Sequence, residues 1–304
     1  MSRVVIDPEV LGTLAEVLRG KSLPPFSFTE PAEFFPPVGH PRALEYFFAV
    51  VMHQYGFWFL EGERWNGVFL GVRDGRTLKG SDFVWYTATR DLLANEPVLT
   101  RFHDDSGTSP LPMKETHEKF TITFAAFKKS HSLEAIVSDA AKRRDGVAFF
   151  VRSLSELPGY REDPLKKKAM LLAMALANRP ERFLPFSPED REAGWGPVID
   201  YHIQRTSLRT GLVRIEDESL AQRLIERVAV SKDEEADIRN TVFEAMRELE
   251  RLSGTSHAAL DLLFFTARRV CPETKPPRCV ECLLEPVCRK RKELFQPVFR
   301  TTYY

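Results

Sequence analysis

The sequence predicts a mainly α-helical protein with a small antiparallel β element near residues 57–80 and a loop of cysteines near its end. Three observations support this prediction. From about residue 82 onward, apolar residues recur at helical spacing. Before that point, aromatic and β-branched runs are broken by Glu-Gly and Asp-Gly pairs, which are typical of hairpins. All four cysteines lie between residues 271 and 288, which indicates one compact site.

Composition restricts the class of protein. The chain has 304 residues, enough for one large domain or two ordinary ones, with 43 basic and 43 acidic side chains. A net charge of zero gives no global field for attracting a polyanion, although a local basic patch is still allowed. The longest apolar run, which contains Met170 to Ala177, is too short to span a membrane, and the first residues lack the apolar stretch of a secretory signal. We therefore expect a cytoplasmic protein without a membrane partner.

The elements can be predicted in order along the chain. Residues 5–19 have the periodicity of an amphipathic helix, and residues 20–40 are rich in proline and phenylalanine and predict an irregular segment. Residues 42–55 are almost wholly apolar, which is typical of a buried helix. Residues 57–80 then supply the short antiparallel strands.

One later helix has both a start signal and an apolar stripe. Ser231 precedes Glu234 by three residues, the spacing of a capping box. The apolar positions that follow are three or four residues apart and lie on one face of the helix: Ile238, Val242, Met246 and Leu249. The opposite face is charged, so this segment predicts a solvated amphipathic helix and no particular function.

The cysteines are spaced as Cys271-x7-Cys279-x2-Cys282-x5-Cys288. Four thiolates this close can enclose a [4Fe–4S] cluster or, as the alternative, a structural zinc ion. The asymmetric spacing resembles the cluster loop of endonuclease III-type glycosylases, with one extra residue in the first gap. We expect a [4Fe–4S] cluster that holds the C-terminal segment in place. Basic residues surround the loop and could balance a cluster's charge or contact phosphate: Arg268, Arg269, Lys275, Arg278, Arg289, Lys290, Arg291 and Lys292.

A second motif lies upstream, in the segment Val-Ile-Asp-Tyr-His-Ile-Gln-Arg that contains Asp200. In endonuclease III-type enzymes a catalytic aspartate begins a helix in a similar context, which Asp200, His202, Ile203 and Arg205 match in type and spacing. A carboxylate at a helix start can cap the exposed amides and stays ionised there. The resemblance implies that Asp200 is the catalytic residue.

A helix-hairpin-helix element is also suggested by the sequence. Leu157-Pro158-Gly159 resembles the start of the hairpin, and Lys167-Lys168-Ala169 occupies the place of the following helix. The hairpin is longer than in endonuclease III and lacks its second glycine, which would let backbone amides approach a DNA phosphate. A duplex-gripping role is therefore not expected.

The chain resembles a branch of the same superfamily more closely, the queuosine 5′-phosphate N-glycosidases of queuosine salvage. The similar segments occur in the same order and cover about residues 42–304; they include Tyr46–Trp58, Lys79–Trp85, Lys167–Ala169, Asp200–Val213, Glu235–Arg239 and Arg300–Tyr304. That family usually has no cysteine loop, so this chain would be an iron–sulfur variant. The resemblance implies a helix-hairpin-helix glycosylase-like helical fold.

This fold is expected to consist of three consecutive parts. Residues 1–110 would form an N-terminal helical part with the small sheet and a pocket wall, residues 111–270 the helical glycosylase-like core, and residues 271–304 the cysteine loop and C-terminal tail. The two larger parts are expected to pack around one site.

The implied activity is hydrolysis of the N-glycosidic bond of queuosine 5′-monophosphate, or of a related 7-deazaguanine nucleotide. Asp200 would act beneath the sugar, Asp261 and Tyr201 would contact the substrate, Lys167 would bind the 5′-phosphate, and Trp58 would stack on the base. Lys167 could instead form a Schiff base, and the aromatic residues around Trp58 could simply be core.

Two other function classes remain open. A DNA base-excision glycosylase would need duplex grip and base flipping, for which the neutral composition is unfavourable. A nucleic-acid-binding module without catalysis would not need the Asp200 motif. We expect a monomer whose partner is a small nucleotide, with duplex DNA as the less favoured ligand.

Overall fold

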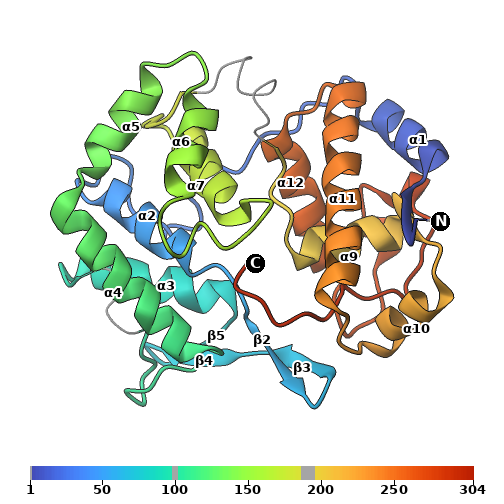
Figure 1. The fold of residues 1–304 in the computed structure, drawn as a ribbon, viewed down its shortest axis with the longest axis horizontal. Coiled ribbons are helices and arrows are strands. Elements are labelled where there is room, and N and C mark those ends of the chain that lie inside the picture. Colours follow the sequence, from blue (N-terminus) through green and yellow to red (C-terminus); the bar gives the residue numbers. More distant parts are fainter. Residues whose placement is uncertain (1, 98–101, 186–195) are drawn as a thin grey trace. The chain divides into compact units, whose positions relative to one another are not determined.

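A computed structural model describes residues 2–97, 102–185 and 196–304, and this part of the chain is mainly helical (Figure 1). Its strands form two-stranded sheets, β1–β6, β2–β3 and β4–β5. The mainly α class and the small antiparallel element near residues 57–80 are therefore confirmed. No helix in the described ranges combines the length and the apolar character needed to cross a membrane.

The chain divides into two compact units. Unit 1 comprises residues 1–26, 60–65 and 196–300, and unit 2 comprises residues 27–59, 66–195 and 301–304. These units do not coincide with the consecutive parts expected from the sequence, 1–110, 111–270 and 271–304. The difference arises because the first residues pair with a strand beyond residue 210, a long-range contact that sequence periodicity does not reveal.

Unit 1 contains the first helix and most of the C-terminal third of the chain. Its elements are β1 (Val4–Ile6), α1 (Pro8–Leu18), α9 (Tyr201–Thr210), β6 (Val213–Ile215), α10 (Glu218–Glu226), α11 (Lys232–Ser253), α12 (His257–Thr266) and the short 3-10 turns η1 (Ala267–Arg269), η2 (Cys279–Glu281) and η3 (Glu285–Val287).

The N-terminal segment is a strand followed by a helix, where the sequence predicts one helix over residues 5–19. The β-branched residues of β1 pair antiparallel with β6, with Val4 opposite Ile215. Asp7 then caps α1, because its carboxylate accepts hydrogen bonds from the amides of Glu9 and Val10. The cap explains why the helix starts only at Pro8.

Helix α11 is the longest helix in unit 1 and begins as its sequence predicts. Ser231 and Glu234 form the capping box, and Gly254 ends the helix in the left-handed conformation. In Figure 1, α11 runs beside α12. Helices α11 and α1 both contribute to one apolar core. The predicted stripe is buried in this core: Ile238, Val242, Met246 and Leu249.

Unit 2 contains the other helices and the small sheets. Its elements are α2 (Ala43–Met52), β4 (Leu70–Arg73), β5 (Arg76–Lys79), α3 (Ser81–Leu93), α4 (Lys114–Ser130), α5 (Leu133–Ala141), α6 (Gly146–Leu154) and α7 (Lys167–Asn178). Strands β2 (Trp58–Glu61) and β3 (Arg64–Val68) pair as a hairpin in which the unit boundaries fall.

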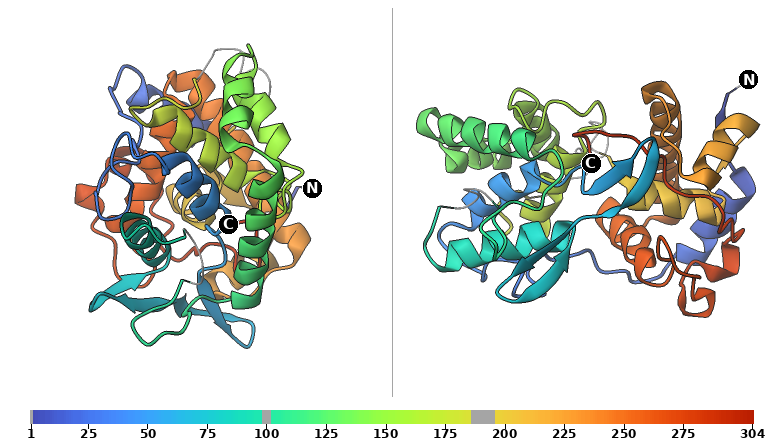
Figure 2. Two further views of the ribbon diagram at one scale, coloured as in Figure 1. Left: turned by 90° about the vertical axis from the view of Figure 1, so that its left-hand side faces the viewer. Right: turned by 90° about the horizontal axis from the view of Figure 1, so that it is seen from below.

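Helix α2 is the centre of unit 2. It contacts α3, α4, α5 and α7, which surround it in the views of Figure 2. Nine of its ten residues are buried, the exception being Glu45, because the helix is apolar around its whole circumference. This matches the buried helix that the sequence predicts over residues 42–55.

Candidate functional site

Asp200 lies at the start of α9 and is fixed by that helix. One carboxylate oxygen, Oδ1, accepts hydrogen bonds from the amides of His202 (2.8 Å) and Ile203 (2.9 Å). The other oxygen, Oδ2, has no hydrogen-bond partner among the described residues, and the side chain is partly exposed. The helix start therefore holds the carboxylate in one orientation and leaves one oxygen available to a ligand.

The remainder of α9 is buried on every side, although its sequence is polar. Its C-terminal end meets the cysteine loop, since the backbone amides of Arg289 and Arg291 donate to the carbonyl oxygens of Thr210 (2.9 Å) and Arg209 (3.0 Å). Gly211 follows with φ +83°, and a Cβ there would lie 2.6 Å from Cγ of Arg289. The helix that carries Asp200 and the cysteine loop are thus packed together tightly.

Arg209 strengthens this contact from inside the unit. Its buried guanidinium donates through Nε to the carbonyl oxygen of Leu294 (2.9 Å) and through Nη1 to that of Pro272 (3.0 Å). Nη1 also lies 3.2 Å from Sγ of Cys271. One turn earlier, Arg205 pairs with Glu273 at 3.4 Å. Two arginines on one face of α9 therefore face the cysteine loop.

Aromatic side chains and a cation lie beside the start of α9. Tyr201 and His202 have ring centroids 4.0 Å apart, and His202 meets Phe265 of α12 edge-on at 5.3 Å. The guanidinium of Arg268 lies over the Phe265 ring, 4.1 Å from its centroid. Burial raises the pKa of Tyr201, and the charges of Asp200 and Arg268 act on this phenol in opposite directions. All of these residues belong to unit 1.

Asp261, predicted to contact the base, is partly exposed on α12, a helix that packs against α9. The structure therefore places Asp200, Tyr201 and Asp261 on two adjoining helices of unit 1.

Lys167 and Trp58 belong to unit 2. Lys167 is 6% exposed, and its Nζ donates to the carbonyl oxygen of Gln54 at 3.0 Å. Trp58 is buried, and its ring stacks on that of Tyr304 with centroids 6.1 Å apart. The five predicted residues are thus divided between the units, with Asp200, Tyr201 and Asp261 in unit 1 and Lys167 and Trp58 in unit 2.

The predicted hairpin connects α6 to α7 through residues 155–166. Gly159 has φ +102°, and its amide donates to both carboxylate oxygens of Glu162 at 3.0 Å. The carboxylate of Glu162 therefore occupies the backbone amide of Gly159.

The cysteine loop gathers four free thiols. Burial raises the pKa values of Cys282 and Cys288, and the charges of the neighbouring cysteines raise them further. The backbone amide of Lys290 donates to Sγ of Cys288 at 3.3 Å. The donor type suits a thiolate-bound metal group. Across the described residues, no three His, Cys, Asp or Glu side chains are arranged as ligands of a metal ion.

A buried polar cluster in unit 2 was not predicted. Nδ1 of His53 and Nδ1 of His117 are 2.9 Å apart, and the His117 ring stacks on Tyr55 with centroids 4.4 Å apart. The fully buried amine of Lys168 lies over the rings of Tyr55 (4.7 Å) and Phe120 (5.0 Å). Burial lowers the pKa of Lys168 to about 7 and that of His117 to about 3. The sequence signal was weak, since Lys168 is one of three adjacent lysines.

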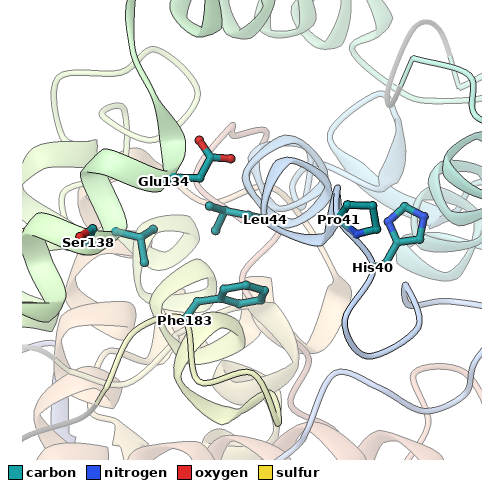
Figure 3. Close-up of a pocket in the computed structure, with 7 residues that line it drawn as sticks. His40, Pro41, Leu44, Glu134, Ser138 and Phe183 are labelled. Atoms are coloured by element: carbon teal, nitrogen blue, oxygen red, sulfur yellow. The ribbon is translucent and has the colours of Figure 1, made fainter.

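A shallow pocket of about 280 Å³ also lies in unit 2 (Figure 3). Leu44, Glu134 and Phe183 border it, and none of the residues predicted from the sequence lines it. We assign no role to it.

No protein-family model matches this sequence, and no curated protein sequence is significantly similar to it.

Proposed function

We propose that the protein is an N-glycosidase that hydrolyses the glycosidic bond of queuosine 5′-monophosphate or a related 7-deazaguanine nucleotide. The observation that supports this proposal best is the arrangement of Asp200. A carboxylate that is held by two amides through one oxygen, with the other oxygen free among the described residues, suits the stabilisation of positive charge on a neighbouring group.

In the proposed reaction, the bond between C1′ of the ribose and the base nitrogen breaks. Positive charge develops on the sugar as the base leaves, and Asp200 stabilises this charge from beneath the ring. A water molecule supplies the hydroxyl group at C1′, and the departing base takes the proton. A 7-deazaguanine has carbon at position 7, so protonation there does not assist departure, and the charge of Asp200 contributes correspondingly more.

A mononucleotide is favoured over duplex DNA by one local observation. The amide of Gly159, which would face a DNA phosphate in a helix-hairpin-helix element, is bonded to Glu162. A carboxylate at that position repels a phosphate, and the chain's net charge of zero offers no compensating field. A DNA base-excision glycosylase is therefore the second candidate.

We also propose that the four cysteines hold a [4Fe–4S] cluster, with a structural zinc ion as the alternative. When bound, such a group would cross-link the C-terminal segment. The contacts of Arg209 with Leu294, Pro272 and Cys271 support a structural role, because they join this segment to the helix of Asp200. The cytoplasmic location and the monomeric state stay predictions.

The test is a chromatographic assay of queuosine 5′-monophosphate with the purified full chain, in which free base is measured. Asp200→Asn is expected to lose about 10²–10⁴-fold in rate, as for removal of a positioned acid–base group. Asparagine also caps helices well, so the fold should be kept. Asp217→Asn is the matched control, because Asp217 caps α10 of the same unit and accepts from the amide of Leu220 at 2.9 Å.

Release of base by wild type and by Asp217→Asn, but not by Asp200→Asn, supports the proposal. If a folded Asp200→Asn protein turns over substrate as fast as wild type, Asp200 has no part in the mechanism. A wild-type protein that releases base from duplex DNA and not from the mononucleotide establishes the second candidate instead.

A further inference from the structure

The basic residues around the cysteine loop differ in whether a carboxylate neutralises them. Four of them form ion pairs at 2.5–2.7 Å: Arg278 with Glu281, Arg289 with Glu9, Lys290 with Glu285, and Arg291 with Glu293. Arg268 forms no ion pair within the described part of the chain. Its charge therefore remains available to an external anion.

Arg268 is also held in place, unlike an ordinary surface arginine. Its guanidinium lies 4.1 Å from the centroid of Phe265, and the Phe265 ring is itself fixed edge-on against His202. Stacking on an aromatic ring leaves the edge of the guanidinium, with its N–H donors, free to meet a planar pair of oxygens. Arg268 is half-buried, so part of the group is open to solvent.

The position of Arg268 relates it to the proposed catalytic residue. A continuous row of side chains leads from Arg268 through Phe265, His202 and Tyr201 to Asp200 at the helix start. The amides at the start of α9 add partial positive charge next to Asp200. A ligand with its sugar at Asp200 would thus have a fixed cation within its own unit.

We propose that Arg268 binds the phosphate of the nucleotide substrate. This inference rests on the proposed function and changes the expected phosphate site. Lys167, which the sequence suggested for that role, is buried in unit 2 and donates to a backbone carbonyl oxygen. An arginine can bind two phosphate oxygens at once through parallel N–H donors, which a lysine does not do. Arg268 is therefore a specificity residue that selects the monophosphate over the nucleoside.

The test compares Arg268→Gln with Arg269→Gln, a control that removes the exposed neighbouring cation. Both changes are made in the Asp200→Asn background, and binding of queuosine 5′-monophosphate and of queuosine is measured by calorimetry. Arg268→Gln is expected to weaken monophosphate binding about 10- to 100-fold, the usual effect of losing a charged hydrogen bond. The affinity of Arg268→Gln for the nucleoside should change by less than about 2-fold. The same limit should hold for the affinities of Arg269→Gln for both ligands.

The assignment is overturned if Arg268→Gln binds the monophosphate and the nucleoside equally more weakly, or if its affinity for the monophosphate is unchanged. A duplex DNA oligonucleotide serves as a third ligand. The assignment is also overturned if no protein binds the mononucleotide and Arg268→Gln loses binding of DNA, since Arg268 would then contact the phosphate of a polymer. If Arg268→Gln does not fold, Arg268→Lys takes its place in the test. This variant keeps the charge without the paired donors, so an intermediate loss of monophosphate affinity is expected. Because binding is measured without turnover, failure of the hydrolysis assay alone does not affect the result.

Discussion

Replacing Lys168 by methionine is expected to remove the contribution of this side chain to stability, which should rise with pH between about pH 7 and about pH 9. The amine of Lys168 is fully buried over two aromatic rings. It has no hydrogen-bond partner among the described residues. Burial lowers its pKa from 10.5 to about 7, and the carboxylates of Glu162 and Asp163 only partly oppose this shift.

The sign follows from proton binding. Between the two pKa values the unfolded chain binds the proton and the folded chain does not, so raising the pH favours the folded state. The shift from 10.5 to about 7 corresponds to about 5 kcal/mol in total, at about 1.36 kcal/mol per unit. About 2 kcal/mol of this lies between pH 7 and pH 9. Methionine fills a similar volume without a charge, so the variant should lack this contribution.

The assay is guanidinium chloride unfolding of wild type, Lys168→Met and Lys129→Met across this pH range. Lys129 is an exposed lysine on α4 of the same unit, so its variant should keep the wild-type pH dependence. Other titrating groups contribute equally to all three proteins, and the difference between profiles therefore isolates Lys168. Parallel profiles for wild type and Lys168→Met would mean that the buried amine keeps its ordinary proton affinity, and the reasoning would be refuted.

Three further predictions concern the histidine pair and the contact between α9 and the cysteine loop. The ring of His117 should stay neutral down to about pH 4, because burial lowers its pKa to about 3, and an NMR titration that finds a midpoint near that of a free histidine would contradict this. Gly211→Ala should lose about 1–2 kcal/mol more than Gly254→Ala in thermal unfolding, since both glycines have positive φ but only Gly211 would place a Cβ against a neighbouring side chain. Arg209→Gln should destabilise the chain by about 2–4 kcal/mol, because it removes the bonds to Leu294, Pro272 and Cys271. It should also speed the alkylation of Cys271 or the release of bound iron. Unchanged rates would show that Arg209 does not hold the cysteine loop in place.

Several features of the site were predictable because they depend on local chemistry. Ser231 caps α11 as expected, since a short polar side chain before an apolar periodic segment satisfies the free amides of the first turn. Asp200 caps α9, the helix start that the resemblance implied. The apolar circumference of α2 likewise predicted a buried helix. In each case the interacting groups are within a few residues of each other.

Other features were not predictable, because they join residues far apart in the chain. The pairing of Val4 with Ile215 converts a predicted helical start into a strand. The bond from Lys167 to Gln54 places that amine inside unit 2 instead of leaving it free for a phosphate. The position of Arg268 over Phe265 beside the helix of Asp200 also depends on how α9 and α12 pack.

The amino-acid sequence was sufficient to predict the mainly helical class, the start of α11 and the grouping of four cysteines, since each follows from side-chain type and spacing along one segment. Which polar groups are satisfied internally, and which remain available to a ligand, depends on the fold. Hydrogen bonds and burial depend on contacts between separate segments, so a lysine and an arginine of equal charge in the sequence differ once one is enclosed against a carbonyl oxygen and the other lies half-exposed on an aromatic ring.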